Sequence, residues 1–149
     1  MKIVIIILLF VILVFPVTAQ TSPDKEGVQK ACMDYIEGFY EGDTSKIIRS
    51  IDTAVFKYGY WKGRNSTTYQ GEAMSFQEMI NYAKEVTEKK HFAKADAPKK
   101  VEIFEVQDQT AAAKVTAWWG TDYILLAKLN DKWMIRSVLW QGPLKTPDK

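Results

Sequence analysis

The chain has 149 residues, with 20 basic and 18 acidic side chains and a formal net charge of +2. Because the two signs nearly cancel, the protein lacks the strong positive field that recruits nucleic acids, and we expect no nucleic-acid partner. A single cysteine, Cys32, and a single histidine, His91, exclude an internal disulfide and a zinc site built from cysteine and histidine. We expect no metal, although a cation site made only of carboxylates is not excluded.

Residues 1–19 have the features of an export signal. Lys2 precedes an unbroken apolar run from Ile3 to Phe15, and Val17-Thr18-Ala19 offers the small residues that a signal peptidase requires. The run is shorter than the roughly 20 residues that a helix needs to span a membrane. We therefore expect cleavage after Ala19, a periplasmic or secreted protein without stable membrane insertion, and a single domain over residues 20–149. An uncleaved N-terminal anchor is the alternative.

Three helices are predicted in the first two thirds of the chain. Apolar residues recur at steps of three and four between Asp24 and Tyr40, which is the stripe of an amphipathic helix. Gly42 is placed to end this helix, and Asp43 is a typical N-cap for a short second helix. The sequence Ser75-Phe76-Gln77-Glu78 matches a capping box and predicts the start of a third helix.

Strands are predicted from Val55 to Trp61 and, after a basic connector, from Val101 to Trp140. The first segment is rich in β-branched and aromatic residues. The second segment changes to a period of two with short connections, which is typical of an antiparallel meander. Because the helices come mainly first and the strands last, the predicted fold class is α+β.

The sequence allows two registers for the last hairpin. A two-residue turn at Asn130-Asp131 would put Lys128 opposite Trp133 and would mix charged with apolar residues on both faces. A three-residue loop that includes Lys132 makes one face nearly all apolar, and we expect this register. Its inner face contains Tyr123, Leu125, Ala127, Leu129, Trp133, Ile135, Ser137 and Leu139. The outer face, which ends at Trp140, is mixed, and such a face often meets a partner subunit.

The order and spacing of these elements resemble the nuclear transport factor 2-like superfamily. Gly-Phe-Tyr-Glu-Gly-Asp at residues 38–43 closes the first helix, and Lys-Trp-Met-Ile at residues 132–135 lies in the last strand. From about Gln29 to Pro143 the chain is similar to a bacterial, exported group named putative lumazine-binding proteins. The resemblance implies a cone-shaped fold of three helices packed on a curved antiparallel sheet, a small molecule at its open end and homodimers formed through the sheet. One departure is Asp52-Thr53, where related sequences have His-Pro.

Several aromatic side chains are candidates to line such a cone. Flat rings can stack there while hydroxyl groups orient a ligand, so a pterin-like or flavin-like heterocycle would suit the site, and we expect no obligatory cofactor. The alternative is that the rings only fill the core beneath a half-buried sheet. The candidate ligand-binding residues are Tyr35, Tyr58, Tyr60, Trp119, Tyr123 and Trp133.

The sequence offers little for acid–base catalysis, which needs a titratable group whose pKa is shifted by burial. Cys32 lies on a core stripe, and His91 lies among lysines. Asp122 is the one candidate carboxylate, beside Trp118-Trp119, although its place after Gly120-Thr121 is more typical of a turn. We therefore expect ligand binding without catalysis. The alternatives are an isomerase-, dehydratase- or hydrolase-like enzyme that uses a carboxylate in the cone, and a dimeric interaction module with a filled core.

Overall fold

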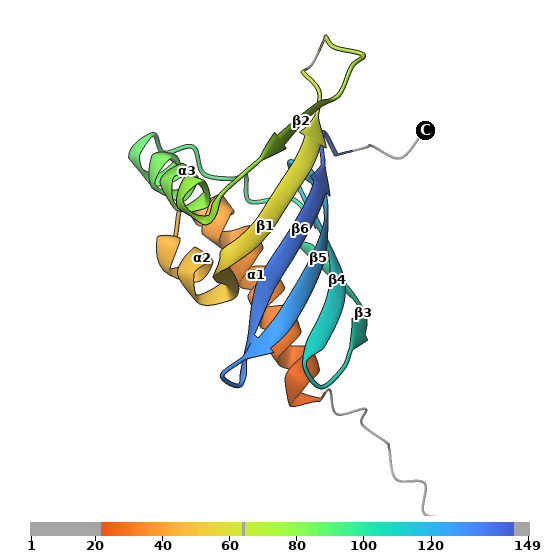
Figure 1. The fold of residues 1–149 in the computed structure, drawn as a ribbon. Helices are drawn as coiled ribbons and strands as arrows, with labels where there is room; N and C mark the ends of the chain where they lie inside the picture. Colours follow the sequence, from red (N-terminus) through yellow and green to blue (C-terminus); the bar gives the residue numbers. More distant parts are fainter. Residues whose placement is uncertain (1–21, 64, 145–149) are drawn as a thin grey trace, which may run out of the picture.

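Within residues 22–63 and 65–144, which the computed structural model describes, three helices and six strands form an α+β fold (Figure 1). The expected export signal, residues 1–19, lies outside this range. No helix in the described part of the chain is long and apolar enough to span a membrane. The helices are α1 (Pro23–Glu41), α2 (Thr44–Ser50) and α3 (Phe76–Glu88), and the strands are β1 (Ile51–Trp61), β2 (Gln70–Ala73), β3 (Lys100–Val106), β4 (Thr110–Ala117), β5 (Gly120–Leu129) and β6 (Lys132–Gln141).

The helix boundaries predicted from the sequence are confirmed by their caps. Gly42 ends α1 in the left-handed conformation, with φ of 68°, which favours glycine. Asp43 then accepts hydrogen bonds from the backbone N–H groups of Ser45 and Lys46 at 2.8 and 3.3 Å. At the start of α3, the Ser75 side chain and the Glu78 side chain form the expected capping box. Each of these signals is local, which is why the sequence alone located them.

The six strands form one sheet in the order β2-β1-β6-β5-β4-β3. Strands β3 to β6 form the expected antiparallel meander, but β1 lies parallel to β6, so the prediction of a wholly antiparallel sheet is wrong at this pair. A parallel pair needs a long connection, and here α3 and the meander supply it. Figure 1 shows α1 crossing behind the sheet, with α2 and α3 near the β1 edge.

The β5–β6 hairpin uses the two-residue turn, so the prediction of a three-residue loop is wrong. Asn130 and Asp131 have φ of 49° and 60°, as a tight hairpin turn requires, and Lys128 pairs with Trp133. The mixing of faces persists at this end, where the Lys128 ammonium pairs with Asp24 at 2.6 Å. A bulge in β6 follows between Ile135 and Ser137. The bulge changes which residues of β6 point inward after Ile135.

The face assignment along β5 is also opposite to the prediction. Asp122, Ile124 and Leu126 are buried on the inner face, whereas Tyr123 and Leu125 are more than half exposed. Both faces of this strand carry apolar side chains, so polarity could not decide between them. The buried position of Asp122 is acceptable because hydrogen-bond donors surround the carboxylate.

Helix α1 provides the centre of the core. Cys32 is fully buried on the stripe where the sequence placed it, and burial raises the pKa of its thiol to about 12. Near the start of α1, the Trp133 ring lies against Gly27, where an added Cβ would come within 2.6 Å of the indole. The Trp133 Nε1 donates to Asp24 Oδ1 at 3.0 Å, so this tryptophan closes one end of the fold. The candidate site lies near the other end of α1.

Candidate functional site

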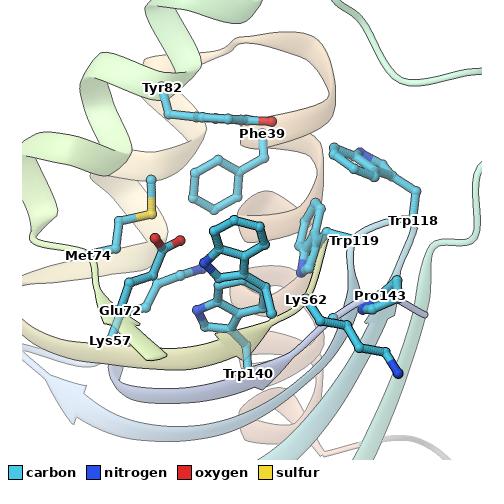
Figure 2. Close-up of a pocket in the computed structure, with 12 residues that line it drawn as sticks. Phe39, Lys57, Lys62, Glu72, Met74, Tyr82, Trp118, Trp119, Trp140 and Pro143 are labelled. Atoms are coloured by element: carbon cyan, nitrogen blue, oxygen red, sulfur yellow. The ribbon is translucent and has the colours of Figure 1, made fainter. Parts of the chain in front are cut away.

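A cavity of about 570 Å³ lies near the C-terminal end of α1, between the helices and the inner face of the sheet (Figure 2). This volume is in the range of small-molecule sites in proteins. The aromatic side chains therefore surround a space and do not fill it. The lining residues are Phe39, Lys57, Trp61, Lys62, Glu72, Met74, Tyr82, Trp118, Trp119, Trp140, Gly142 and Pro143.

The floor of the cavity holds a buried lysine. Lys57 points inward from β1 and is only 7% exposed. Its Nζ lies over the rings of Tyr35, Phe39 and Trp140, at 4.9, 5.1 and 5.9 Å from their centroids. The Nζ also donates a hydrogen bond to the Tyr35 hydroxyl. Burial lowers the pKa of Lys57, while the nearby carboxylates of Asp122 and Glu72 act in the opposite direction.

Asp122 lies behind this lysine and is fully buried, so its interpretation as a turn carboxylate is wrong. One carboxylate oxygen, Oδ2, accepts a hydrogen bond from the Tyr35 hydroxyl at 2.5 Å, and the other accepts from Trp119 Nε1 at 2.8 Å. The Lys57 Nζ is 4.0 Å from Oδ2. Burial, and then the charge of Asp122, raise the pKa of Tyr35 well above its ordinary value. Lys57, Tyr35 and Asp122 thus form a hydrogen-bonded chain beneath the cavity.

Trp140 covers the neighbouring part of the floor. It pairs with Gly59 on β1, and a Cβ at position 59 would lie 2.1 Å from the indole, so the ring can lie against the strand only because this residue is glycine. The indole Nε1 is buried and has no hydrogen-bond partner among the described residues. An unpaired buried donor is costly, and a ligand with an acceptor group would satisfy it.

The structure brings together only part of the predicted ligand-binding set. Trp119 lines the cavity, and Tyr35 lies beneath it on Lys57. Tyr58 and Tyr60 point from β1 to the opposite face of the sheet from Lys57, and Tyr123 is 55% exposed. None of these three lines the cavity. Trp133 is buried as expected, but it lies at the other end of α1.

Sequence reasoning missed Lys57 and placed Trp140 on the outer face. In β1 the aromatic residues alternate with Lys57 and Gly59, so hydrophobicity alone favoured the tyrosines as the inner residues. The bulge in β6 then reverses the face expected for Trp140. Gly59 is the sequence feature that could have indicated the inner face of β1, since a glycine inside a strand often marks the close approach of a large side chain.

The part of the chain that the structure describes contains no cluster of typical metal ligands. No three side chains of histidine, cysteine, aspartate or glutamate lie together there as metal ligands. The residues that line the cavity instead offer the amines of Lys57 and Lys62, the indole N–H of Trp140, the hydroxyl of Tyr82 and the carboxylate of Glu72. These groups suit an organic ligand with hydrogen-bond acceptors.

Solved structures show the same fold in several bacteria. An NTF2-like protein of unknown function from Shewanella baltica has a TM-score of 0.63 and 16% identity, with 83% of this chain and 99% of that chain covered. An NTF-2-like protein of unknown function from Silicibacter pomeroyi has a TM-score of 0.60 and 16% identity over 78% of this chain and 92% of that chain. A putative dehydratase of the NTF2-like family from Streptomyces avermitilis has a TM-score of 0.53 and 13% identity, with coverage of 82% and 97%.

Family membership comes from the sequence, since similarities at these identities show the fold alone. A comparison with curated proteins gives no match. The family model described as "Putative lumazine-binding" matches residues 23–141, which run from the first turn of α1 to the end of β6 and include both the cavity floor and its aromatic wall. The chain therefore belongs to the putative lumazine-binding family, and it shares the fold of NTF2-like proteins.

Proposed function

We propose that this domain binds a flat aromatic or apolar small molecule in the cavity and does not act on it through a carboxylate. The observation that carries the proposal is the cavity of about 570 Å³, which has an aromatic wall and donors at its floor. Rings such as Phe39, Trp119 and Trp140 offer both edges and faces for stacking. The family name supports the same class of ligand.

The polarity of the floor restricts the ligand further. Lys57 and Trp140 both offer N–H donors, whereas the buried carboxylate of Asp122 is occupied by Tyr35 and Trp119. A ligand that carries carbonyl or ring-nitrogen acceptors on one edge would complement these donors. Pterin-like and flavin-like heterocycles have this combination of a flat ring system and an acceptor edge.

Thermal unfolding with lumazine, riboflavin and a steroid tests this proposal. A ligand that binds only the folded state stabilises it by about 2.7 kcal/mol at 100 times its Kd, so a bound heterocycle raises the Tm. We expect Trp118→Ala to weaken binding, since Trp118 lines the cavity and is half exposed. Tyr123→Ala, at a half-exposed position on the outer face, is the matched control. A panel without any shift, or equal losses in both variants, would contradict the proposal.

An enzyme of the isomerase, dehydratase or hydrolase type is the alternative. In such an enzyme the cone carboxylate has to reach the substrate as a base or acid. Asp122 is not among the residues that line the cavity, and both of its oxygens accept hydrogen bonds. This geometry suits a residue that positions Tyr35 and Lys57. Glu72, the carboxylate that does line the cavity, lies exposed on β2, outside the buried floor, which is why we favour binding.

We also propose that the domain is a homodimer joined through the outer face of its sheet. Phe56, Tyr123, Leu125 and Leu139 expose between 50% and 62% of their surfaces there. Leu139 pairs directly with Tyr123 on one side and with Tyr58 on the other, so the patch is continuous over β1, β6 and β5. A continuous apolar patch of this kind marks an association surface, and native mass spectrometry measures the subunit number.

Export remains a prediction of the sequence, and we propose that the domain works outside the cytoplasm. Cleavage after Ala19 would release a chain that begins at Gln20. Edman sequencing of the protein recovered from the periplasm or the culture medium tests this. Recovery of the full-length chain in the membrane fraction would support the anchor instead.

A further inference from the structure

Lys57 differs from every other lysine in the described residues because it alone is buried. Its Nζ lies on the floor of the cavity, among three aromatic rings. Lys62 also lines the cavity, but it is partly exposed and lies over Tyr69. A molecule that fills the cavity therefore reaches the amine of Lys57 at its floor.

The surroundings of Lys57 favour the neutral amine. A lysine ammonium has three N–H donors, and the acceptor found for it here is the neutral hydroxyl of Tyr35. The nearest carboxylate oxygen, on Asp122, is 4.0 Å from Nζ, which is beyond hydrogen-bond distance. Burial, which disfavours the charged form, lowers the pKa of Lys57, and the charges of Asp122 and Glu72 offset this only in part. A neutral amine inside an apolar cavity is a nucleophile.

Tyr35 gives this amine a path for protons. The Tyr35 hydroxyl accepts from Lys57 Nζ and donates to Asp122 Oδ2 at 2.5 Å. Trp119 Nε1 holds the other oxygen of the carboxylate at 2.8 Å, so the chain is fixed in one geometry. Protons can thus be taken from the nitrogen and returned from beneath, while a ligand occupies the cavity above.

We propose that Lys57 reversibly captures an apolar or aromatic aldehyde as a Schiff base. The neutral Nζ forms a bond to the carbonyl carbon as the C=O π bond breaks, and one proton passes from the nitrogen to the oxygen to give a carbinolamine. The nitrogen then loses its proton and the hydroxyl group leaves as water, so amine and aldehyde give imine and water. Tyr35 and Asp122 are positioning residues that move the protons. The proposal rests on the proposed function, since the aldehyde has to enter the same cavity.

The wall of the cavity defines the class of aldehyde. Phe39, Trp119 and Trp140 present rings, and Met74 presents a flexible apolar side chain. Figure 2 shows these side chains gathered around the space above Lys57. The buried, unpaired Nε1 of Trp140 offers a donor to the oxygen that the carbonyl group carries until water leaves. Flat aldehydes with one or two fused rings fit these surroundings.

Reductive trapping with 2-naphthaldehyde and sodium cyanoborohydride at neutral pH tests the inference. The reductant converts an imine into a stable secondary amine, and we expect one added naphthylmethyl group, located at Lys57 by peptide mapping. Labelling at Lys57 should exceed that at the surface lysines, since burial favours its neutral and nucleophilic amine. Lys57→Met and Lys57→Arg should both lose this label, and Lys84→Met, at an exposed position of α3 outside the cavity lining, is the control and should keep it.

Binding without chemistry is measured separately with 2-methylnaphthalene, which has no carbonyl group. If this compound raises the Tm while 2-naphthaldehyde labels only exposed lysines, the Schiff base is refuted and the binding cavity stands. If 2-methylnaphthalene does not raise the Tm and 2-naphthaldehyde does not label Lys57, both proposals fail. Should Lys57→Met lose its circular dichroism signal, Lys57→Arg and the peptide map of the wild-type protein decide the question. Equal labelling of Lys57 and surface lysines in that map overturns the inference.

Discussion

At the residue scale, the molecule departs most from sequence expectation at its buried charges. Lys57 and Asp122 are both buried, and a phenol bridges them in place of a direct ion pair. Local polarity patterns place charges at the surface, so a sequence pattern cannot reveal a charge pair whose partners lie on β1 and β5. The buried carboxylate of Asp122 is stabilised by hydrogen bonds from Tyr35 and Trp119, and these donors come together only in the folded chain.

Removing the charge of Asp122 should therefore be costly. Asp122→Asn keeps the size of the side chain but replaces one of the two oxygens that accept from Tyr35 and Trp119 with an amide N–H₂ group, and a buried donor left without its acceptor costs about 1 to 3 kcal/mol. Urea unfolding measures the loss in the free energy of unfolding. Asp108→Asn, at an exposed turn position, serves as the control and should change stability little. A loss below about 1 kcal/mol would show that the two buried donors do not both need a carboxylate oxygen.

The depressed pKa of Lys57 also predicts a pH dependence of stability. Between the folded-state pKa and the ordinary value of 10.5, the unfolded chain holds a proton that the folded chain has lost, so stability rises with pH. Tyr35, whose pKa is raised, acts in the opposite sense above its ordinary value of 10.0, so the comparison is made below that pH. The difference in unfolding free energy between wild type and Lys57→Met should increase towards pH 10.0, by at most about 1.4 kcal/mol per pH unit. Lys62→Met should follow the wild-type profile, and a flat difference would contradict the prediction.

At the element scale, the β5–β6 hairpin depends on a tight turn with two residues in the left-handed region. Asn130 tolerates this conformation, and glycine is preferred at the second position, where Asp131 has φ of 60°. We expect Asp131→Gly to stabilise the protein by about 0.5 to 1 kcal/mol in urea unfolding. Asp108→Gly, at a turn without positive φ, should not stabilise. Destabilisation by Asp131→Gly would show that the aspartate side chain itself holds the turn.

The same hairpin shows how far the sequence could predict this fold. Helix ends could be predicted because caps such as Gly42 and Ser75 act within one helical turn. The faces of β1 and β5 could not, since apolar side chains lie on both sides of each strand. The bulge in β6 and the parallel pairing of β1 with β6 are long-range features without a local signal. Of the candidate site, Trp119 was accessible to sequence reasoning, but Lys57 was not.

At the scale of the whole molecule, the sheet has two apolar faces with separate surroundings. Alternate residues of β1 point to the two faces. Lys57 and Trp61 line the cavity, whereas Phe56 and Tyr60 are exposed on the other side. A strand pattern with apolar residues on both faces is usually a sign of burial on both sides. In the isolated chain only the inner face is covered, by the helices (Figure 1). A second copy of the chain would cover the other.

Leu139→Lys tests whether the outer face of the sheet forms the dimer while the inner face forms the cavity. It places a charge in the middle of the outer patch, next to Tyr58 and Tyr123, and we expect the dimer to dissociate in native mass spectrometry because burying an unpaired charge is costly. Ile48→Lys, on α2 and 56% exposed, is the matched control and should leave the dimer intact. The change lies on the opposite face of the sheet from the cavity, so ligand-induced shifts in Tm should persist in the monomer. Loss of ligand binding together with dissociation would instead mean that the second subunit supports the cavity.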